Sequence, residues 1–205
     1  MQRGIIRLVT TLDTTGSTVL DPALVDAAAA VLDEGGIHAL TLTEIAARAG
    51  VSRVTVHRRG AGLDEYIVAV LARASDDLRR SLWPVMTSQG RAIDRLASAL
   101  SILSQVCERH SGIMVAMFGV PARPLPDRPD RTTSLEFIEP FAKLIADGVA
   151  DDSIVCDDPL QDATLTANTV AWSYLHMRRA HGWRTDDAAG RVVELALGHL
   201  TPTLR

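Results

Sequence analysis

Cysteine, lysine and aromatic residues are all scarce in this chain of 205 residues. The two cysteines, Cys107 and Cys156, are too few for a disulfide framework and too isolated for a zinc site. We therefore predict that both are structural thiols, buried or half-buried. Lys143 is the only lysine, so arginine carries almost all of the basic charge.

Long apolar runs are absent as well. No stretch approaches the ~18 consecutive apolar residues that would span a bilayer. The segment 1–10 has too few apolar residues for the core of a signal peptide. We therefore expect a cytoplasmic protein with no membrane partner.

The chain lacks the positive net charge that is typical of nucleic-acid-binding proteins, since its formal charge is −4. The distribution of charge is more informative than the sum. The segment 48–59 contains Arg48, Arg53, Arg58 and Arg59 and no acidic residue. This arginine patch is a local positive surface on an acidic protein, and a DNA backbone would be attracted to it.

Apolar residues repeat at helical spacing along most of the chain, and no segment alternates as a strand would. We therefore predict an all-α fold. The segment 1–19 shows no sustained period and is predicted to be an N-terminal arm. The chain is 47% hydrophobic, which is enough for a sizeable core. Beyond the arm, we predict a small N-terminal domain at 20–66 and a larger helical domain at 67–205.

Capping signals divide the N-terminal part into three helices. Asp21 and Pro22 open the first, which Gly35 and Gly36 are predicted to end. The segment 41–44 (Thr-Leu-Thr-Glu) fits a capping box for a short second helix. Gly50 ends that helix, and Ser52 is predicted to cap a third that runs to about Arg59.

The larger domain is predicted to consist of long helices. The apolar stripes lie at about 67–82, closed by Trp83-Pro84, at about 93–103, and at about 135–149. A short apolar piece at 113–118 is followed by a proline-rich loop. The last two helices are expected at about 158–181 and 185–200, the second capped at Thr185–Asp187.

The two short helices joined by Gly50-Val51-Ser52 have the form of a helix-turn-helix. Glycine permits the left-handed backbone of the turn, and the second helix presents Arg53 to the outside. Arginine can hydrogen-bond the edge of a guanine through two donors, and arginine and threonine can hold phosphates. The sequence therefore predicts a DNA-binding N-terminal domain.

The segment 41–56, Thr-Leu-Thr-Glu-Ile-Ala-Ala-Arg-Ala-Gly-Val-Ser-Arg-Val-Thr-Val, closely resembles the N-terminal signature of the TetR family of transcription regulators. The resemblance is specific over about residues 20–70. It implies a three-helix DNA-binding domain joined to a C-terminal ligand-binding and dimerisation domain. It also implies a repressor that leaves a palindromic operator when a small-molecule effector binds.

The resemblance assigns roles to particular positions. Residues at the start of the second helix would contact phosphates or an outer base. Residues of the third helix, the recognition helix, would enter the major groove or contact the DNA backbone beside it. The implied DNA-binding residues are Thr41, Thr43, Arg53, Val54, Thr55, His57, Arg58 and Arg59. Two positions depart from the family pattern: Gly60 replaces a packing aromatic, and Leu63 lies near a position that is usually lysine. These departures leave open an alternative, a helical interaction or ligand-binding protein with a weakened DNA-binding domain.

Methionine and aromatic residues in the larger domain could form an adaptable pocket for a mostly apolar effector, although such residues are commonly plain core. The candidate ligand-binding residues are Met114, Met117, Phe118, Phe141, Trp172 and His176. The histidines at 176, 181 and 199 do not have the spacing of metal ligands, so we predict no metal and no cofactor.

An enzyme would need a nucleophile with its base, or paired carboxylates, at a pocket. No local signature of that kind links the scattered serines, histidines and acids, so we predict that the chain is not an enzyme. The last two helices carry apolar residues that a monomer would leave exposed, which predicts a homodimer formed through them. The residues concerned are Leu160, Ala167, Val170, Ala171, Val193, Leu197 and Leu200.

Overall fold

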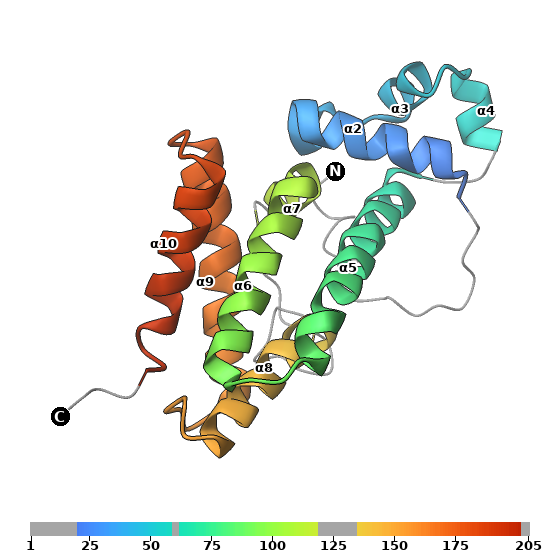
Figure 1. Cartoon of the computed structure of the whole chain (residues 1–205). Coiled ribbons are helices and arrows are strands. Elements are labelled where there is room, and N and C mark those ends of the chain that lie inside the picture. Colours follow the sequence, from blue (N-terminus) through green and yellow to red (C-terminus); the bar gives the residue numbers. More distant parts are fainter. Residues whose placement is uncertain (1–19, 59–61, 119–134, 202–205) are drawn as a thin grey trace. The chain divides into compact units, whose positions relative to one another are not determined.

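The computed structural model describes residues 20–58, 62–118 and 135–201 (Figure 1). Within these ranges the chain is helical and has no strand, so the all-α prediction is confirmed. The predicted N-terminal arm, Gly60 and the proline-rich loop lie outside the described residues. The described helices are α2 (Pro22–Ala39), α3 (Leu42–Arg48), α4 (Arg53–Arg58), α5 (Leu63–Thr87), α6 (Ala92–Arg109), α7 (Ser111–Phe118), α8 (Leu135–Ala150), α9 (Pro159–Arg179) and α10 (Thr185–Leu197).

Contacts between residues divide the chain into two compact units. The N-terminal unit comprises residues 1–75 and 110–132, and it holds α2, α3, α4, the first half of α5, and α7. The C-terminal unit comprises residues 76–109 and 133–205, and it holds the rest of α5 with α6, α8, α9 and α10. A domain boundary at residue 66 stays a prediction.

The N-terminal unit is built around α2, which packs against both α3 and α7. The Asp21 carboxylate accepts a hydrogen bond from Ala23 N at 3.0 Å and Pro22 follows it, so the predicted helix start is confirmed. The regular helix breaks at Gly36, whose φ is +67°, and one further turn reaches Ala39. The fully buried side chains of this unit include Leu24, Ala28, Leu32, Leu40, Ile45, Val56 and Tyr66.

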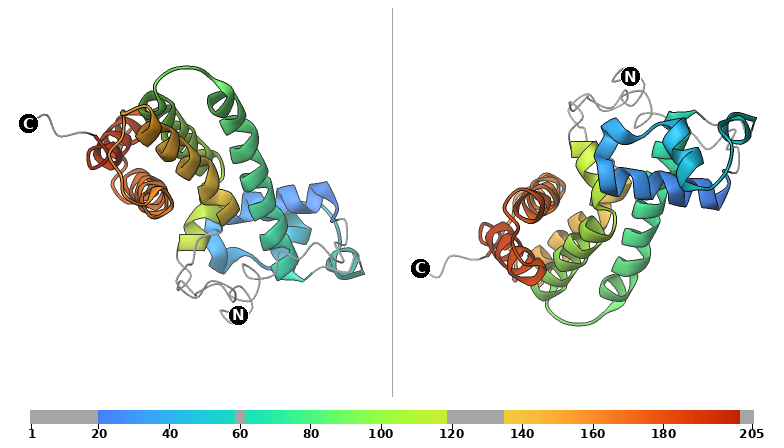
Figure 2. Two further views of the ribbon diagram at one scale, coloured as in Figure 1. Left: turned by 90° about the horizontal axis from the view of Figure 1, so that it is seen from below. Right: turned by 90° about the horizontal axis from the view of Figure 1, so that it is seen from above.

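In the C-terminal unit, α6 packs against α8, α9 and α10. Seen along their axes in both views of Figure 2, α9 and α10 lie side by side. The core of this unit is almost entirely apolar and includes Leu96, Leu100, Leu103, Phe141, Leu144, Ile145, Ala167, Val170 and Tyr174. None of the described helices is both long and apolar enough to cross a membrane.

Two predicted helix ends are wrong. The α5 helix continues through Pro84 to Thr87, because proline removes only one donor and the terminal carbonyls find other partners. The Thr87 hydroxyl donates to the Trp83 carbonyl at 3.0 Å. Thr185 is not a cap but the first residue of α10, and Arg184 before it makes no side-chain capping bond.

The apolar residues expected to lie exposed on the last two helices are mostly core of the C-terminal unit. Ala167, Val170, Ala171, Val193 and Leu200 are all buried, so the argument that a monomer would expose them is wrong. A different apolar set is exposed on α9 and α10: Leu165 at 56%, Trp172 at 49% and Leu195 at 71%.

Candidate nucleic-acid interface

The turn between α3 and α4 is fixed by backbone hydrogen bonds of a Schellman motif. Gly50 N donates to the Ala47 carbonyl at 3.2 Å, and Val51 N donates to the Ala46 carbonyl at 3.0 Å. This geometry places Gly50 in the left-handed region at φ +67°, as the sequence predicts. The α3 helix therefore stops sharply, and the chain is redirected within three residues.

Ser52 then caps α4, as predicted. Its hydroxyl oxygen accepts from Thr55 N at 3.1 Å, and its side chain also pairs with the Thr55 hydroxyl at 2.9 Å. The backbone carbonyl of Ser52 accepts from Thr55 N and Val56 N, which starts the helix. The Thr55 hydroxyl is thus engaged within the turn.

The short α4 helix has an inner and an outer side. Val56 is fully buried, together with Ile45 and Ala46 of α3. Arg53 and Val54 are exposed, and the exposed fraction of Val54 is 73%. The packing of one side onto α3 therefore holds the other side outward.

At the start of α3 the Thr41 hydroxyl accepts from Glu44 N at 3.1 Å, so Thr41 is an N-cap as predicted. Thr43 is exposed on the first turn of the same helix. His57 and Arg58 are the last two residues of α4, and Arg59 lies outside the described residues. The DNA-binding role of each of these residues stays a prediction.

The arginine patch is less positive than the sequence suggests. Arg48 forms an ion pair with Glu34 of α2, which offsets its charge and links α3 to α2. The side chains are 14 residues apart in sequence, so local pattern analysis could not pair them. Arg53 in α4 keeps its exposed position.

Contacts with two helices, α5 and α7, hold α2 in place within the N-terminal unit. Arg73 of α5 donates to the Pro22 carbonyl at 3.1 Å and forms an ion pair with Asp26. Asp33 accepts from Gly112 N, the second residue of α7, at 2.7 Å. The bond from Gly112 N to the Asp33 carboxylate is a charge-assisted cap for α7, which the sequence pattern did not predict.

The candidate ligand-binding residues fall in both units. In the N-terminal unit, Met114 is buried and Met117 half-buried on α7, and Phe118 is the last residue of that helix. In the C-terminal unit, Phe141 is fully buried, whereas Trp172 and His176 are exposed on α9. The Trp172 and His176 rings stack, with centroids 6.4 Å apart. The role of the six residues in ligand binding stays a prediction.

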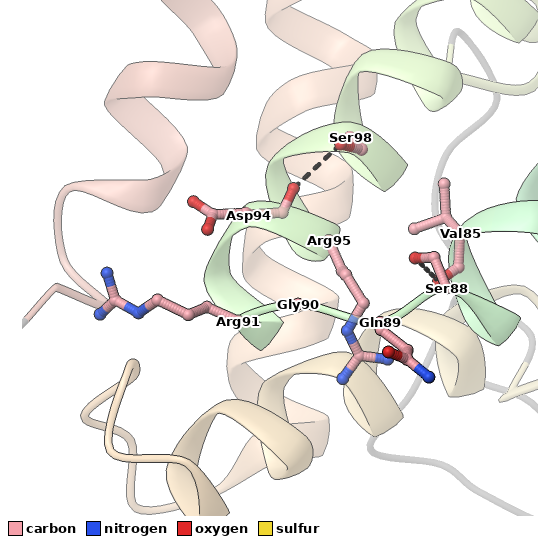
Figure 3. Close-up of a pocket in the computed structure, with 8 residues that line it drawn as sticks. All are labelled: Val85, Ser88, Gln89, Gly90, Arg91, Asp94, Arg95 and Ser98. Carbon is pink, nitrogen blue, oxygen red and sulfur yellow. Dashed lines mark hydrogen bonds between the residues drawn. The ribbon is translucent and has the colours of Figure 1, made fainter.

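A hollow of about 170 Å³ lies at the turn between α5 and α6 (Figure 3). Arg95, which lines it, points toward Gln89, while Arg91 points away from both. Arg95 is already paired with Asp147 at 3.1 Å. None of the six candidate ligand-binding residues lines this hollow.

A polar network inside the C-terminal unit was not foreseen from the sequence. Glu108 of α6 accepts from the Tyr174 hydroxyl at 2.9 Å and from two nitrogens of Arg178, both residues of α9. The hydrogen bonds from Arg178 lower the pKa of Glu108. Burial and the bond to Glu108 raise the pKa of Tyr174 to about 12. The network is a structural clamp between two helices.

The two cysteines are buried or half-buried thiols, as predicted. Cys107 is fully buried in α6, and burial raises its pKa to about 12. Cys156 is half-buried, and burial together with a hydrogen bond to Asp162 raises its pKa to about 11. Among the described residues, no three His, Cys, Asp or Glu side chains are grouped as a metal site would require.

Comparison with known proteins connects this helix-turn-helix to a family. Residues 24–59 match the model of bacterial regulatory proteins of the tetR family. No curated protein matches the chain.

Solved structures share the fold over most of the chain. The TetR family transcriptional regulator PfmR from Thermus thermophilus superposes with a TM-score of 0.67 at 16% identity, covering 86% of this chain and 97% of its own. The ketosteroid transcriptional regulator KstR2 of Mycobacterium tuberculosis gives 0.64 at 18% identity, covering 87% and 93%. The SmeT–triclosan complex gives 0.62 at 16% identity, covering 88% and 91%. The segment 24–59, which contains the helix-turn-helix, thus matches the tetR-family model, and the fold of the chain is similar to that of these regulators.

Proposed function

We propose that the chain is a repressor that binds a palindromic operator as a homodimer and is released when a mostly apolar small molecule binds. The observation that carries the proposal is the outward side of α4, where Arg53 is exposed directly after a fixed turn. In this position a guanidinium can reach base edges in the major groove. Arg53 is proposed to read bases, while Thr41, Thr43, His57, Arg58 and Arg59 hold phosphates. The protein would act in the cytoplasm.

Dimerisation would place two such helices on one duplex. Leu165 of α9 and Leu195 of α10 are exposed apolar side chains that a second copy would cover. Two recognition helices related by a two-fold axis need half-sites about 34 Å apart or a multiple of that distance. The operator is therefore proposed to be palindromic.

The DNA-binding part is tested by selecting genomic fragments with the purified protein and measuring affinity over a salt series. Arg53→Ala is expected to lose about tenfold or more in affinity for the selected site and to relax base preference at one position per half-site. Arg58→Ala is expected to weaken all sequences alike and to flatten the salt dependence. The control is Arg79→Ala, because Arg79 is an exposed arginine on α5, outside the helix-turn-helix, and forms an ion pair with Asp76 on the same helix.

A protein that selects no fragment, or variants that bind every site as the wild type does, would contradict this assignment. Failure to select any fragment would favour the alternative, a helical interaction or ligand-binding protein. A monomer in light scattering at micromolar concentration would contradict the dimer.

The effector is proposed to be mostly apolar because SmeT is solved with triclosan and KstR2 is named for ketosteroids. Triclosan and a ketosteroid are therefore suitable probes. Binding near Trp172, which is 49% exposed, would shift its fluorescence and lower the affinity for the operator. Trp172→Phe is expected to remove the fluorescence response. A broad ligand screen in which no compound releases DNA would refute this part.

A further inference from the structure

Val54 is an apolar side chain exposed where neither packing nor helix stability explains it. Its exposed fraction, 73%, is the largest among the large apolar side chains of the described residues. It stands on a helix of six residues, whose inward contact is already made by Val56. Valine is also a poor helix former, so this position gains nothing from it in the free protein.

The neighbours of Val54 restrict what the outward side of α4 can offer. Arg53 is exposed beside it, and no acidic residue occurs between positions 48 and 59. Thr55 follows, but its hydroxyl pairs with the Ser52 hydroxyl at 2.9 Å. Position 54 thus presents only methyl groups to whatever α4 contacts.

In the major groove one base carries an apolar feature of its own, the 5-methyl group of thymine. The other base edges carry hydrogen-bond donors and acceptors, which a valine cannot satisfy. We propose that Val54 is a specificity-determining residue whose methyl groups contact the 5-methyl group of one thymine in each half-site. This inference rests on the proposed DNA-binding function and adds the chemistry of one base position to it.

The contact can be removed from either side of the interface without disturbing any hydrogen bond. Replacing a thymine by deoxyuridine deletes only the 5-methyl group. The experiment replaces each thymine of a selected fragment in turn, symmetrically in both half-sites, and measures affinity by fluorescence polarisation. The wild type is expected to lose about threefold to tenfold in affinity at one symmetric position, since two buried methyl contacts are removed.

Val54→Ala should weaken binding to thymine-containing DNA by a similar factor, because the shorter side chain cannot reach the groove wall. In this variant the deoxyuridine substitution should have almost no further effect, so the two losses are not additive. The matched control is Val155→Ala, which shortens another exposed valine, 61% exposed, in the C-terminal unit. That variant should keep the full sensitivity to deoxyuridine.

A second arm uses cytosine at the sensitive position. Cytosine should bind weakly, and 5-methylcytosine should recover part of the affinity for the wild type but not for Val54→Ala. Equal loss with deoxyuridine in wild type and Val54→Ala, or no sensitive thymine at all, would overturn the inference while leaving DNA binding intact. Failure to select any DNA would overturn the proposed function and this inference with it.

Discussion

The packing of α7 against α2 leaves no room for a single added carbon at Gly112. A Cβ atom there would lie 2.4 Å from the Leu32 carbonyl carbon, 2.5 Å from Asp33 N and 2.6 Å from the Leu32 oxygen. Ordinary contacts between carbon atoms are about 3.5–4.0 Å, so the overlap is roughly 1 Å. All three atoms belong to the backbone of α2, which cannot turn aside as a flexible side chain would.

In Gly112→Ala the two helices must separate. This separation loosens the contacts of Leu32 and Ile113, both fully buried, and lengthens the 2.7 Å bond from Gly112 N to Asp33. Overpacking costs about 1–3 kcal/mol, and a weakened charge-assisted hydrogen bond costs about 1 kcal/mol more. Alanine returns about 0.5–1 kcal/mol through its helix propensity. The net loss of unfolding free energy is therefore about 1–3.5 kcal/mol, or a melting temperature lower by about 2–14 °C.

Gly190→Ala is the matched control, because it makes the same chemical change within α10. Nothing lies within 4 Å of a Cβ atom at Gly190. We expect this variant to be more stable than the wild type by about 0.5–1 kcal/mol. Thermal and urea unfolding followed by circular dichroism measure both variants. If Gly112→Ala unfolds as the wild type does, the close approach of α7 to α2 is not a feature of the folded protein.

Three further predictions follow from contacts described above. Glu108→Gln removes charge-assisted bonds to Arg178, but since the Glu108 side chain is 36% exposed, we expect a loss of only about 1 kcal/mol at pH 7. The pKa of Glu108 is lowered in the folded protein, so its contribution to stability is complete above the unfolded pKa of about 4.3 and is lost as the pH falls through the folded pKa. The difference in stability between Glu108→Gln and the wild type, measured by urea unfolding, should therefore shrink below about pH 4. Thr41→Ala should cost about 1 kcal/mol through loss of the bond to Glu44 N, with Thr41→Ser close to wild type; equal melting of all three would refute the cap. Leu195→Asp should shift the molecular mass in light scattering from dimer to monomer, and an unchanged dimer would place the interface elsewhere.

The features that the sequence predicts well depend on residues close together in the chain. The caps at Asp21, Thr41 and Ser52 join atoms at most three residues apart, and the turn at Gly50 is equally local. Such contacts are determined by residue type and spacing, so a pattern is enough to find them. The helix-turn-helix and the all-α fold follow from these contacts and from the apolar period.

The features that the sequence missed join distant parts of the chain. Glu108 and Arg178 are 70 residues apart, and the contact between Gly112 N and Asp33 spans 79. An apolar period also shows that a helix has a buried face without showing what buries it. Val170 and Val193 therefore looked available to a second subunit, although they are core residues of their own unit.

The burial of Cys107 makes it a built-in reporter of opening in the C-terminal unit. A thiol whose pKa is about 12 has almost no thiolate at neutral pH, so maleimide or a disulfide reagent cannot react with it while α6 remains packed. Reaction requires the helices around α6 to part, and its rate therefore measures how often they do so. With Cys156 replaced by serine, the labelling rate of this one native thiol would compare the free protein with its DNA-bound form, without any probe attached to the surface.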